Sequence, residues 1–339
     1  MAQLAPAADT ARLSAGTVLV TGASGFVGGA VARRLAANGV THVRAMVRAS
    51  SRIERLRVPG IEIVRGDLLD VASLRAACEG ADAIIHAAGC VTPVRRAVLW
   101  NTSVEGTRNL LAVMAPRVRR FVFVSSFAVY LNADHDENRL PRASGDLYGD
   151  SRIAAEAELR GHPRVSILRA PAIYGPGSAV WSERYLRLAS RRRLFLPGRG
   201  AFSFAYVFVE NLVDAILAAA DDRTPPGIYN IVDGHLPYRE FVAPYARAMH
   251  APMRELPLWL LRPGVSIATW GARAFDIWFP LSPVFLRYLL SGRSGAASAD
   301  RARTLLGWHP RVTFDEGIAM TLSHRQGAHE QMPMFQEPG

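Results

Sequence analysis

The sequence contains no lysine, so all 40 of its basic residues are arginines. With 29 acidic residues the formal net charge is +11, and this balance favours anionic partners: a phosphorylated cofactor, a membrane surface or nucleic acid. The arginine runs, such as 117–120 and 191–193, are scattered between apolar segments, and no zinc-finger spacing or other nucleic-acid-binding motif accompanies them. We therefore expect a solvated, arginine-rich surface and no nucleic acid as a partner.

Cysteine is also scarce, and long apolar runs are missing. Cys78 and Cys90 are the only cysteines, which excludes a disulfide framework and indicates a reducing compartment. No run of about eighteen apolar residues is present, so we expect no membrane-spanning helix. Residues 1–14 lack the charged start and apolar block of a signal peptide, and we expect a disordered tail there and a second tail at 326–339. Together these features favour a cytoplasmic protein.

A glycine-rich turn stands near the start of the chain, at residues 21–28, which read TGASGFVG. It follows a short β-branched run and precedes a helical pattern of apolar residues, which is the context of a dinucleotide-binding turn. The first glycine permits the turn, the second lets the backbone approach a pyrophosphate, and the third lets the helix lie close to the strand. We therefore predict cofactor contacts from Gly22, Ser24, Gly25, Phe26, Val27 and Gly28.

The second predicted strand, residues 42–47, indicates which cofactor is bound. It is followed by Arg48, twenty positions after Gly28, where an NAD site would carry an acidic residue for the ribose 2′-hydroxyl. No acidic residue occurs between Arg48 and Glu54. Arg48 and the neighbouring Ser50, Ser51 and Arg52 offer hydrogen-bond donors for a 2′-phosphate instead, so NADP is favoured and NAD is the alternative.

Further short apolar runs at 61–64, 83–85 and 121–124 alternate with helical patterns up to residue 169. This alternation predicts an α/β fold with a doubly wound parallel sheet of Rossmann type. Because the carboxyl ends of parallel strands meet at the ligand crevice, the residues after two of the runs are candidates for cofactor contact. They are Asp67, Leu68, Ala87 and Ala88, of which Asp67 is placed to accept from an adenine amino group or to serve only as a turn residue.

Six motifs in order resemble the extended short-chain dehydrogenase/reductase family, over about residues 16–325. They are TGASGFVG at 21–28, GD at 66–67, HAA at 86–88, SS at 125–126, YGDSR at 148–152 and RAPAIYGP at 169–176. The resemblance implies that Tyr148 transfers a proton and that Ser126 orients the substrate oxygen. This suits hydride transfer between a nicotinamide and an alcohol or ketone, in which that oxygen must gain or lose a proton. It also implies cofactor contacts from Tyr148, Arg152 and Pro171.

The chain departs from the family at Arg152, where lysine normally follows the tyrosine by four residues. Positions four apart share a helix face, so Arg152 can place a positive charge near Tyr148 and hydrogen-bond a ribose. It does not readily release a proton, and three readings stay open: altered but real catalysis, a weakened enzyme, or an NADP-binding protein without turnover. Because the whole chain lacks lysine, we favour retained activity. A second departure is Ser103, where the family often has asparagine.

The alternation of strands and helices becomes irregular after residue 169. We expect the NADP-binding domain to comprise 15–170 and 204–234, and a smaller, mostly helical substrate-binding region to comprise 171–203 and 235–325. Residues 134–137 read DHDE, and these residue types can bind a metal ion. Four adjacent residues in a polar loop are more typical of a solvated turn, so we expect no metal site.

The substrate is expected to be apolar. Sugar-nucleotide members of the family are similar to one another in using two polar residues to hold the diphosphate. The matching positions in this chain are Ala172 and Phe204. Segments 204–213, 256–260 and 306–310 resemble the branch of 3β-hydroxysteroid and sterol-carboxylate dehydrogenases. We therefore expect an NAD(P)-dependent oxidoreductase that interconverts a hydroxyl and a ketone on a steroid-like or lipid-like molecule, with a sugar-nucleotide epimerase or dehydratase as the alternative.

Two expectations concern partners. Residues 257–290 are apolar and carry three tryptophans, a pattern that fits the roof of an apolar pocket, a patch for peripheral membrane contact, or an ordinary core or dimer contact. By family analogy alone, paired helices at 98–114 and 148–159 favour a homodimer.

Overall fold

The computed structural model describes residues 16–90, 94–278 and 282–330. Most of the two predicted tails, 1–14 and 326–339, therefore lies outside the described residues. The exception is 326–330, where the last helix, α12 (Phe314–Glu330), continues into the expected C-terminal tail. No helix in the described ranges combines the length and the apolar character needed to cross a bilayer.

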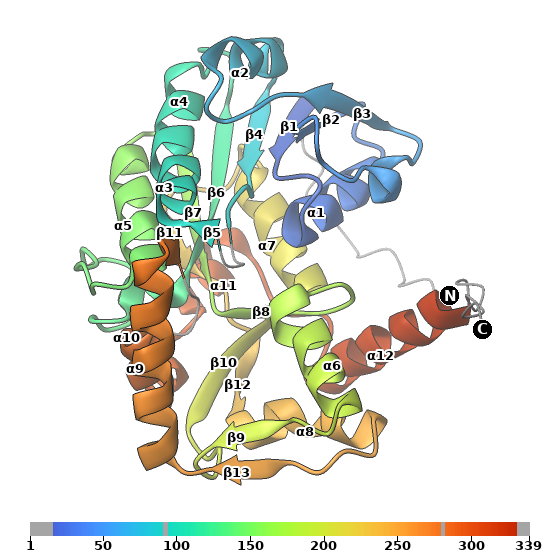
Figure 1. Cartoon of the computed structure of the whole chain (residues 1–339). Helices are drawn as coiled ribbons and strands as arrows, with labels where there is room; N and C mark the ends of the chain where they lie inside the picture. The colour runs from blue at the N-terminus through green and yellow to red at the C-terminus, as the bar shows by residue number, and fades with distance from the viewer. Residues whose placement is uncertain (1–15, 91–93, 279–281, 331–339) are drawn as a thin grey trace, which may run out of the picture.

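Seven parallel strands form the central sheet, in the order β11-β7-β6-β4-β1-β2-β3 (Figure 1). The order reverses between β1 and β4, and in such sheets ligands bind beyond the carboxyl ends of the strands at this reversal. The predicted doubly wound fold is confirmed. The strands are β1 (Thr17–Thr21), β2 (His42–Val47), β3 (Ile61–Arg65), β4 (Ala83–His86), β6 (Arg120–Ser126), β7 (Val165–Ala170) and β11 (Ile228–Asn230).

Helices cover both faces of this sheet. Val18 and Val20 of β1 belong to the core under one set of helices, and Leu19 between them belongs to the core on the other face. This follows from the two-residue period of a strand, and all three side chains are fully buried. The first set is α1 (Phe26–Ala37) and α7 (Val209–Ala220), and the second is α2 (Val71–Cys78), α4 (Gly106–Ala112) and α5 (Leu147–Leu159).

A buried ion pair fixes α5 to the sheet. Glu156 of α5 and Arg169 of β7 are both fully buried, with 2.6 Å between Oε2 and Nη2. The carboxylate also accepts from Ser125 Oγ at 2.6 Å, and Arg169 Nη1 donates to Tyr130 Oη at 2.7 Å. Tyr130 in turn donates to Asn230 Oδ1 at 2.8 Å, so the network extends to the last strand, β11. The two buried charges of Glu156 and Arg169 are thus paired with each other, which is the condition for tolerating them.

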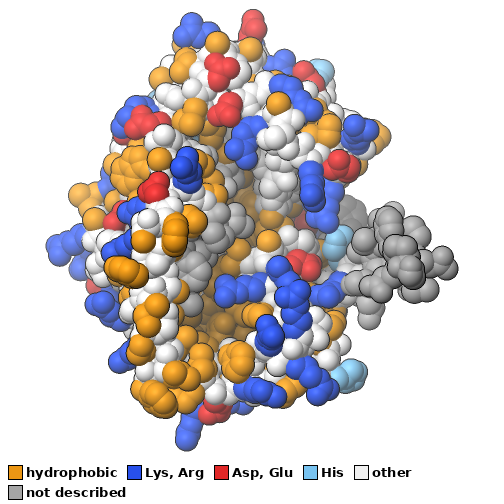
Figure 2. All heavy atoms as spheres, in the orientation of Figure 1, with side chains coloured by type: hydrophobic (Ala, Val, Ile, Leu, Met, Phe, Trp, Pro, Cys, Tyr) orange, Lys and Arg blue, Asp and Glu red, His pale blue; other side chains and the backbone are white. Residues whose placement is uncertain are grey.

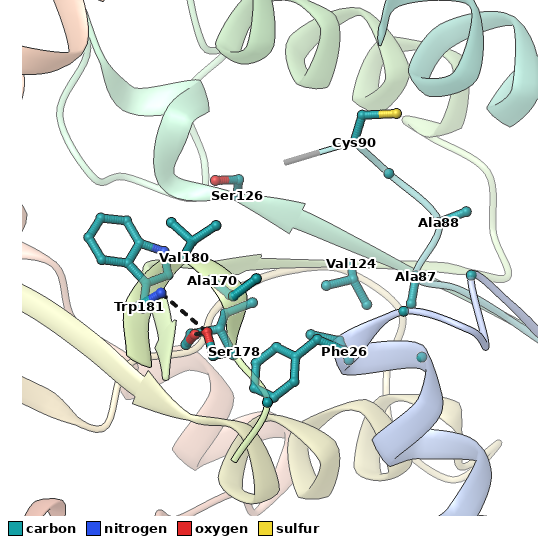
Figure 3. Close-up of a pocket in the computed structure, with 18 of the residues that line it drawn as sticks. Phe26, Ala87, Ala88, Cys90, Val124, Ser126, Ala170, Ser178, Val180 and Trp181 are labelled. Atoms are coloured by element: carbon teal, nitrogen blue, oxygen red, sulfur yellow. Dashed lines mark hydrogen bonds between the residues drawn. The ribbon is translucent and has the colours of Figure 1, made fainter. Parts of the chain in front are cut away.

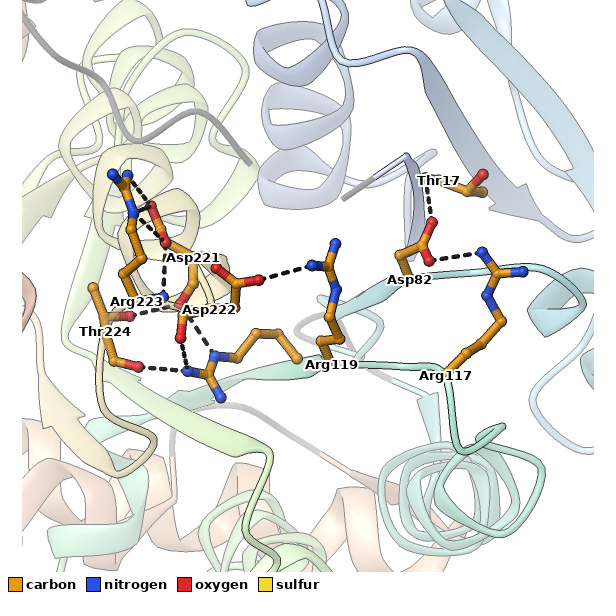
Figure 4. Close-up of polar contacts among 9 residues, drawn as sticks. Thr17, Asp82, Arg117, Arg119, Asp221, Asp222, Arg223 and Thr224 are labelled. Atoms are coloured by element: carbon orange, nitrogen blue, oxygen red, sulfur yellow. Dashed lines mark hydrogen bonds and ion pairs between the residues drawn. The ribbon is translucent and has the colours of Figure 1, made fainter. Parts of the chain in front are cut away.

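Ion pairs at the amino ends of the strands close the opposite edge of the sheet (Figure 4). Asp82, just before β4, accepts from the backbone N–H of Thr17 at 2.9 Å and from Arg117 at 2.7 Å. Arg119, just before β6, pairs with Asp222 at 2.8 Å. These contacts connect the loops at the amino edge and leave the carboxyl edge for a ligand.

The helix predicted at 98–114 is interrupted. It consists of α3 (Arg96–Trp100), the π-helical turn η2 (Asn101–Glu105) and α4. Thr107 Oγ1 of α4 donates to the carbonyl of Ser103, which lies in this turn, at 2.6 Å. The hydroxyl of Ser103 itself is buried without a partner among the described residues.

The smaller region contains short strands in addition to the helices that were predicted for it. Its sheet has the order β12-β10-β8, and the alternating aromatic residues Phe204, Tyr206 and Phe208 explain why β10 forms a strand. Residues 204–208, which we expected in the NADP-binding domain, form β10 of this smaller sheet, whereas β11 belongs to the seven-stranded sheet. The strands are β8 (Ala172–Tyr174), β10 (Ser203–Phe208) and β12 (Gly234–Pro237), with a separate pair β9 (Phe195–Pro197) and β13 (Arg254–Leu256).

The remaining elements complete this region. Among them β14 pairs antiparallel with β5 and thereby connects the C-terminal part to the loop after β4. They are β5 (Val94–Arg95), α6 (Arg184–Ser190), α8 (Tyr238–Ala248), α9 (Leu258–Ala274), β14 (Ile277–Trp278), α10 (Pro283–Ser291) and α11 (Asp300–Leu306).

Candidate active site

A cavity of about 930 Å³ opens at the carboxyl edge of the central sheet, between the sheet and the smaller region. Figure 2 shows the hollow in the face of the molecule, with hydrophobic side chains inside it. All the residues predicted from the sequence for cofactor binding or catalysis line this one cavity. They are Gly22, Ser24, Gly25, Phe26, Val27, Gly28, Arg48, Asp67, Leu68, Ala87, Ala88, Ser126, Tyr148, Arg152 and Pro171.

The glycine turn packs too tightly for any side chain at its first and third glycines. Gly22 has φ +69°, and a Cβ there would lie 2.6 Å from Cα of Ala88. A Cβ at Gly28 would collide with the carbonyl oxygen of Gly22. Helix α1 starts at Phe26 with no acidic residue in its first turn. Because residues 25–28 all line the cavity, the N–H groups at the start of this helix lie beside it, as a pyrophosphate site requires.

A cluster of arginines surrounds the outer end of the cavity, beyond the glycine turn. Arg48 is exposed, and its backbone N–H donates to Ser51 Oγ at 3.1 Å. Arg55 extends to the facing loop, since a Cβ at Gly177 would lie 3.0 Å from its Nη1. Desolvation lowers the pKa of Arg33; Glu210 raises it again, and the positive charge of Arg55 lowers it further. Cations that repel one another beside a cavity favour an anionic ligand.

Arg33 and Arg55 were not among the residues predicted to bind the cofactor. The signal for Arg33 was its spacing: it lies seven residues, two helical turns, after Phe26 and therefore on the same face of α1. The next residue, Arg34, points elsewhere and forms an ion pair with Asp214 of α7 at 2.7 Å.

Asp67 lines the cavity and also stabilises the turn in which it lies. Its Oδ1 accepts from the backbone N–H of Leu69 at 2.9 Å, and its side chain is exposed. Asp67 therefore has the turn role that was one of the two alternatives for it. The other alternative, accepting from an adenine amino group, stays a prediction. Leu68 is buried between this loop and α4. A Cβ at Gly106 of α4 would lie 2.8 Å from Cβ of Leu68, so the two residues pack closely.

Helix α5 positions Tyr148 in its first turn. Asp146 caps the helix, with Oδ1 accepting from the backbone N–H of Gly149 at 2.9 Å. Its other oxygen accepts from Ser282 Oγ at 2.6 Å, which connects the start of α5 to the start of α10. Ser126 ends β6, and its Oγ accepts from the N–H of Ala128 at 3.2 Å, so its hydroxyl proton is available to donate.

Arg152 lies one turn after Tyr148 and is almost fully buried, at 3% exposed. Its guanidinium carbon is 5.4 Å from the ring centre of Tyr148 and 5.5 Å from that of Phe123. Nε and Nη1 have no hydrogen-bond partner among the described residues. Because an unsatisfied buried cation is costly, these two donors indicate that a ligand oxygen belongs beside them.

His86 forms buried contacts between neighbouring elements of the fold. Its Nδ1 is 2.7 Å from Thr21 Oγ1 and its Nε2 is 3.0 Å from Thr107 Oγ1. Burial, assisted by the charge of Arg152, lowers the pKa of His86 to about 3. The imidazole is therefore neutral near pH 7 and connects β1, β4 and α4.

The inner end of the cavity, beyond Ser126, is walled mainly by apolar side chains. Figure 3 shows Val180 and Trp181 close to Ser126, with Ser178 accepting from the N–H of Trp181. Ala172 and Phe204 both line this end and are buried. They are the two positions that match the polar residues of sugar-nucleotide members. Most of the wall was not predicted individually: Phe127, Ala128, Val180, Trp181, Tyr185, Phe285 and Leu289.

The polar segment 134–137 is occupied with contacts inside the protein. His135 Nε2 is 2.6 Å from Tyr288 Oη, and Glu137 accepts from the backbone N–H of Asn230 at 2.9 Å. Burial, together with the charge of Arg293, lowers the pKa of His135 to about 4. The segment therefore supports the α10 side of the cavity.

Comparison with known proteins is consistent with this geometry. The protein is 31% identical to sterol demethylase protein B of Methylococcus capsulatus, over 89% of this chain and 97% of that protein. It is 28% identical to a 3 beta-hydroxysteroid dehydrogenase/Delta 5-->4-isomerase of Mycobacterium tuberculosis, over 94% and 92%. The crystal structure of gox2253 has the same fold, with a TM-score of 0.75 at 24% identity over 94% of this chain and 100% of that one.

The match to a whole family agrees with the individual relatives. The NAD dependent epimerase/dehydratase family matches residues 18–232, from the first strand of the sheet to just beyond the last. This segment contains the glycine turn and all three candidate catalytic residues. The chain therefore belongs to the NAD dependent epimerase/dehydratase family, the extended short-chain dehydrogenases/reductases.

Proposed function

We propose that this protein is an NADP-dependent oxidoreductase that interconverts a hydroxyl and a ketone on a steroid-like or other lipid-like molecule. The observation that carries the proposal is the position of Ser126 and Tyr148. Both line the same cavity as the glycine turn and as the aromatic side chains of Trp181 and Phe204. A dinucleotide and an apolar substrate would meet at these two hydroxyls.

The residues present fit NADP. The turn at Gly22 and Gly28 leaves no room for a Cβ, so the backbone itself forms the cradle for a pyrophosphate. Arg48, Arg33 and Arg55 supply positive charge where a 2′-phosphate would need it. The two donors of Arg152 without a protein partner suit ribose hydroxyls.

The side chains of this protein would handle the proton. When bound, the nicotinamide supplies or accepts the hydride. Tyr148 would pass its phenolic proton to the substrate oxygen during reduction, and Ser126 would donate a hydrogen bond to that oxygen and orient it. The buried guanidinium of Arg152, 5.4 Å from the tyrosine ring centre, would stabilise the phenolate that remains. Because arginine does not release a proton readily, the phenol would be reprotonated by water rather than by residue 152.

Apolar burial would provide most of the substrate affinity. Removing apolar surface from water contributes about 25 cal/mol per Å², and the inner wall offers aromatic surfaces from Phe127, Trp181 and Phe204. A diphosphate would find no matching polar residues at Ala172 and Phe204. Each missing charge-assisted hydrogen bond would cost it about 1.5–3 kcal/mol. The named activities of the relatives, on hydroxysteroids and sterols, support the same substrate class.

The test is NADPH oxidation by the purified protein with a panel of steroid ketones and long-chain ketones, and NADP reduction with the matching alcohols. We expect turnover of at least one apolar pair and loss of about 100-fold or more in Tyr148→Phe, which keeps the ring but removes the proton. Binding of NADPH by both proteins, measured by calorimetry, is the control for folding.

Two results would overturn the proposal. Turnover of a UDP- or dTDP-sugar, with none of the apolar substrates, would make the protein a sugar-nucleotide enzyme. Tight NADPH binding with no turnover of any ketone or alcohol in the panel would make it a cofactor-binding protein without catalysis, particularly if Arg152→Lys then conferred activity.

A further inference from the structure

Helix α9 lies on the surface with nearly all of its length exposed. Of its 17 residues only Val265 is buried, and it faces inward together with the half-buried Leu258, Leu261 and Thr269. An ordinary surface helix turns polar side chains outward. The outward side chains of α9 are mostly apolar instead.

The outward face of α9 is apolar. With about 3.6 residues per turn, positions 259, 263, 267, 270 and 274 fall on the side opposite Val265. Trp259 is 75% exposed, Ile267 69% and Trp270 74%, and Leu260 beside them is 51% exposed. Figure 2 shows hydrophobic side chains along this helix, next to the hollow. Large apolar side chains gathered on one exposed face indicate a surface that contacts another apolar phase.

The charges around this face have one sign. Between Glu255 and Asp276 the sequence has no acidic residue. Arg262 and Arg273 fall together along one edge of the outward face, both exposed, and Arg287 of α10 is exposed as well. Within the described ranges no ion pair involves any of the three. These cations are available to an external anion.

We propose that α9 docks the protein on an anionic phospholipid surface, lying in the plane of the interface without crossing it. The tryptophans would sit at the level of the headgroups, where an aromatic side chain with a polar edge is favoured, and the arginines would contact lipid phosphates. The net charge of +11 would add a long-range attraction to an anionic membrane. A second copy of this chain would carry the same arginines to the contact, so charge complementarity favours the lipid.

The position of α9 gives this docking a consequence for the cavity. α9 packs against α10, and α10 contributes Phe285 and Leu289 to the inner, apolar wall. Docking α9 would bring this wall close to the bilayer, so an apolar substrate could pass from lipid to cavity without crossing water. Only this consequence depends on the proposed function; membrane docking itself does not.

The experiment is co-sedimentation of the full chain with vesicles of neutral phosphatidylcholine and with vesicles that also contain anionic phosphatidylglycerol. We expect binding to the anionic vesicles, weakened by salt, and a loss of about tenfold in the partition coefficient when Trp259→Ser and Trp270→Ser are combined. The matched control is Leu69→Ser with Val71→Ser, which removes exposed apolar side chains near α2, at the other end of the molecule. That control should bind like the wild type.

Two further variants separate the contributions of charge and of the tryptophans. Arg262→Gln with Arg273→Gln should weaken binding more than Arg191→Gln with Arg193→Gln, an equal change of charge at another exposed site. Trp259→Phe with Trp270→Phe should still sediment with vesicles but lose the blue shift of tryptophan emission that the wild type shows on binding.

Two outcomes would overturn the proposal. One is wild-type protein that stays in the supernatant with anionic vesicles, or that sediments equally well after the tryptophan-to-serine substitutions. The other is a stable dimer in the absence of lipid that the same substitutions dissociate, which would assign the face to a second copy of the chain.

Discussion

The guanidinium of Arg152 lies directly against Gly89, in the space that a side chain at position 89 would occupy. The two residues come from α5 and from the loop after β4, and they meet beside the ring of Tyr148. Glycine at 89 is therefore what allows an arginine, with its larger planar head, to lie where the family has a lysine.

Gly89→Ala should disturb the site through Arg152 alone. The backbone at Gly89 is not in the left-handed region, so alanine causes no conformational strain there, but its Cβ would collide with Nη2 of Arg152. We expect kcat/KM to fall by about 100-fold because the guanidinium is displaced from its position, with little change in the thermal midpoint. Gly264→Ala, where a Cβ meets nothing within 4 Å, should leave kcat/KM unchanged and raise the thermal midpoint slightly, because Gly264 lies inside α9 and alanine favours a helix. Full activity in Gly89→Ala would show that the position of Arg152 is unimportant.

Substitutions of Arg152 itself should separate its charge from its shape. Arg152→Met removes the cation, and we expect a loss of about 100-fold or more in kcat together with weaker NADPH binding. Arg152→Lys keeps the cation and fits the same space, so activity should stay within about tenfold of the wild type. Steady-state kinetics and calorimetry with NADPH measure both effects. Equal activity in all three proteins would argue against an electrostatic role.

Arg48→Ala should change the preference between the two coenzymes. If Arg48 holds a 2′-phosphate, its loss removes a charge-assisted hydrogen bond of about 1.5–3 kcal/mol, or about 10- to 150-fold in affinity for NADPH. Affinity for NADH should remain the same, because NADH lacks this phosphate. Arg57→Ala, an exposed arginine that does not line the cavity, is the control. An equal loss for both coenzymes would contradict the assignment.

His86 should make the folded state sensitive to acid. The pKa of His86 is lowered from 6.5 to about 3 in the folded protein by burial and by Arg152. As pH falls below 6.5 the unfolded chain binds a proton that the folded chain does not, so stability falls, by up to about 4 kcal/mol by the time pH 3 is reached. In His86→Asn, which keeps one donor and one acceptor but does not titrate, the free energy of unfolding should depend less steeply on pH between 6.5 and 4. Parallel curves from urea titrations of the two proteins would refute this.

Breaking the buried ion pair should be far more damaging than breaking an exposed one on the same helix. Glu156→Gln leaves Arg169 charged and fully buried, and we expect a loss of about 3–5 kcal/mol in the free energy of unfolding. Glu158→Gln, which affects the exposed pair with Arg108, should cost less than about 1 kcal/mol. Chemical denaturation of both variants gives the comparison. Similar losses would mean that burial of the pair is not what matters.

The lining of the cavity at its glycine-turn end was predictable because it comes from short stretches that are local in sequence. Residues 21–28 carry the turn, and the apolar runs and their endings place Asp67, Ala87 and Ser126 at one edge of a parallel sheet. Glycine at 22 and 28 is dictated by backbone contacts that any such turn must make. Local sequence therefore determines this end of the cavity.

The lining of the apolar end of the cavity was less predictable because no periodicity connects its parts. Trp181 and Phe285 are far apart in the sequence and line the same cavity only because of tertiary packing. The π-helical turn at 101–105 was also missed, because the apolar spacing of residues 98–114 reads as one helix. The choice between Arg33 and Arg34 depended on their helix faces: one lines the cavity and the other pairs with Asp214.

The place of β11 in the sheet has a consequence for how the chain folds as it is synthesised. Strand β7 ends at Ala170, but its outer neighbour β11 begins only at Ile228, after β8 and β10 have been made. Until then β7 is an open edge, and Tyr130 lacks the acceptor that Asn230 provides. We expect a nascent chain stalled before residue 228 to be prone to aggregation and to chaperone binding, and release of β11 from the ribosome to be the step that protects it.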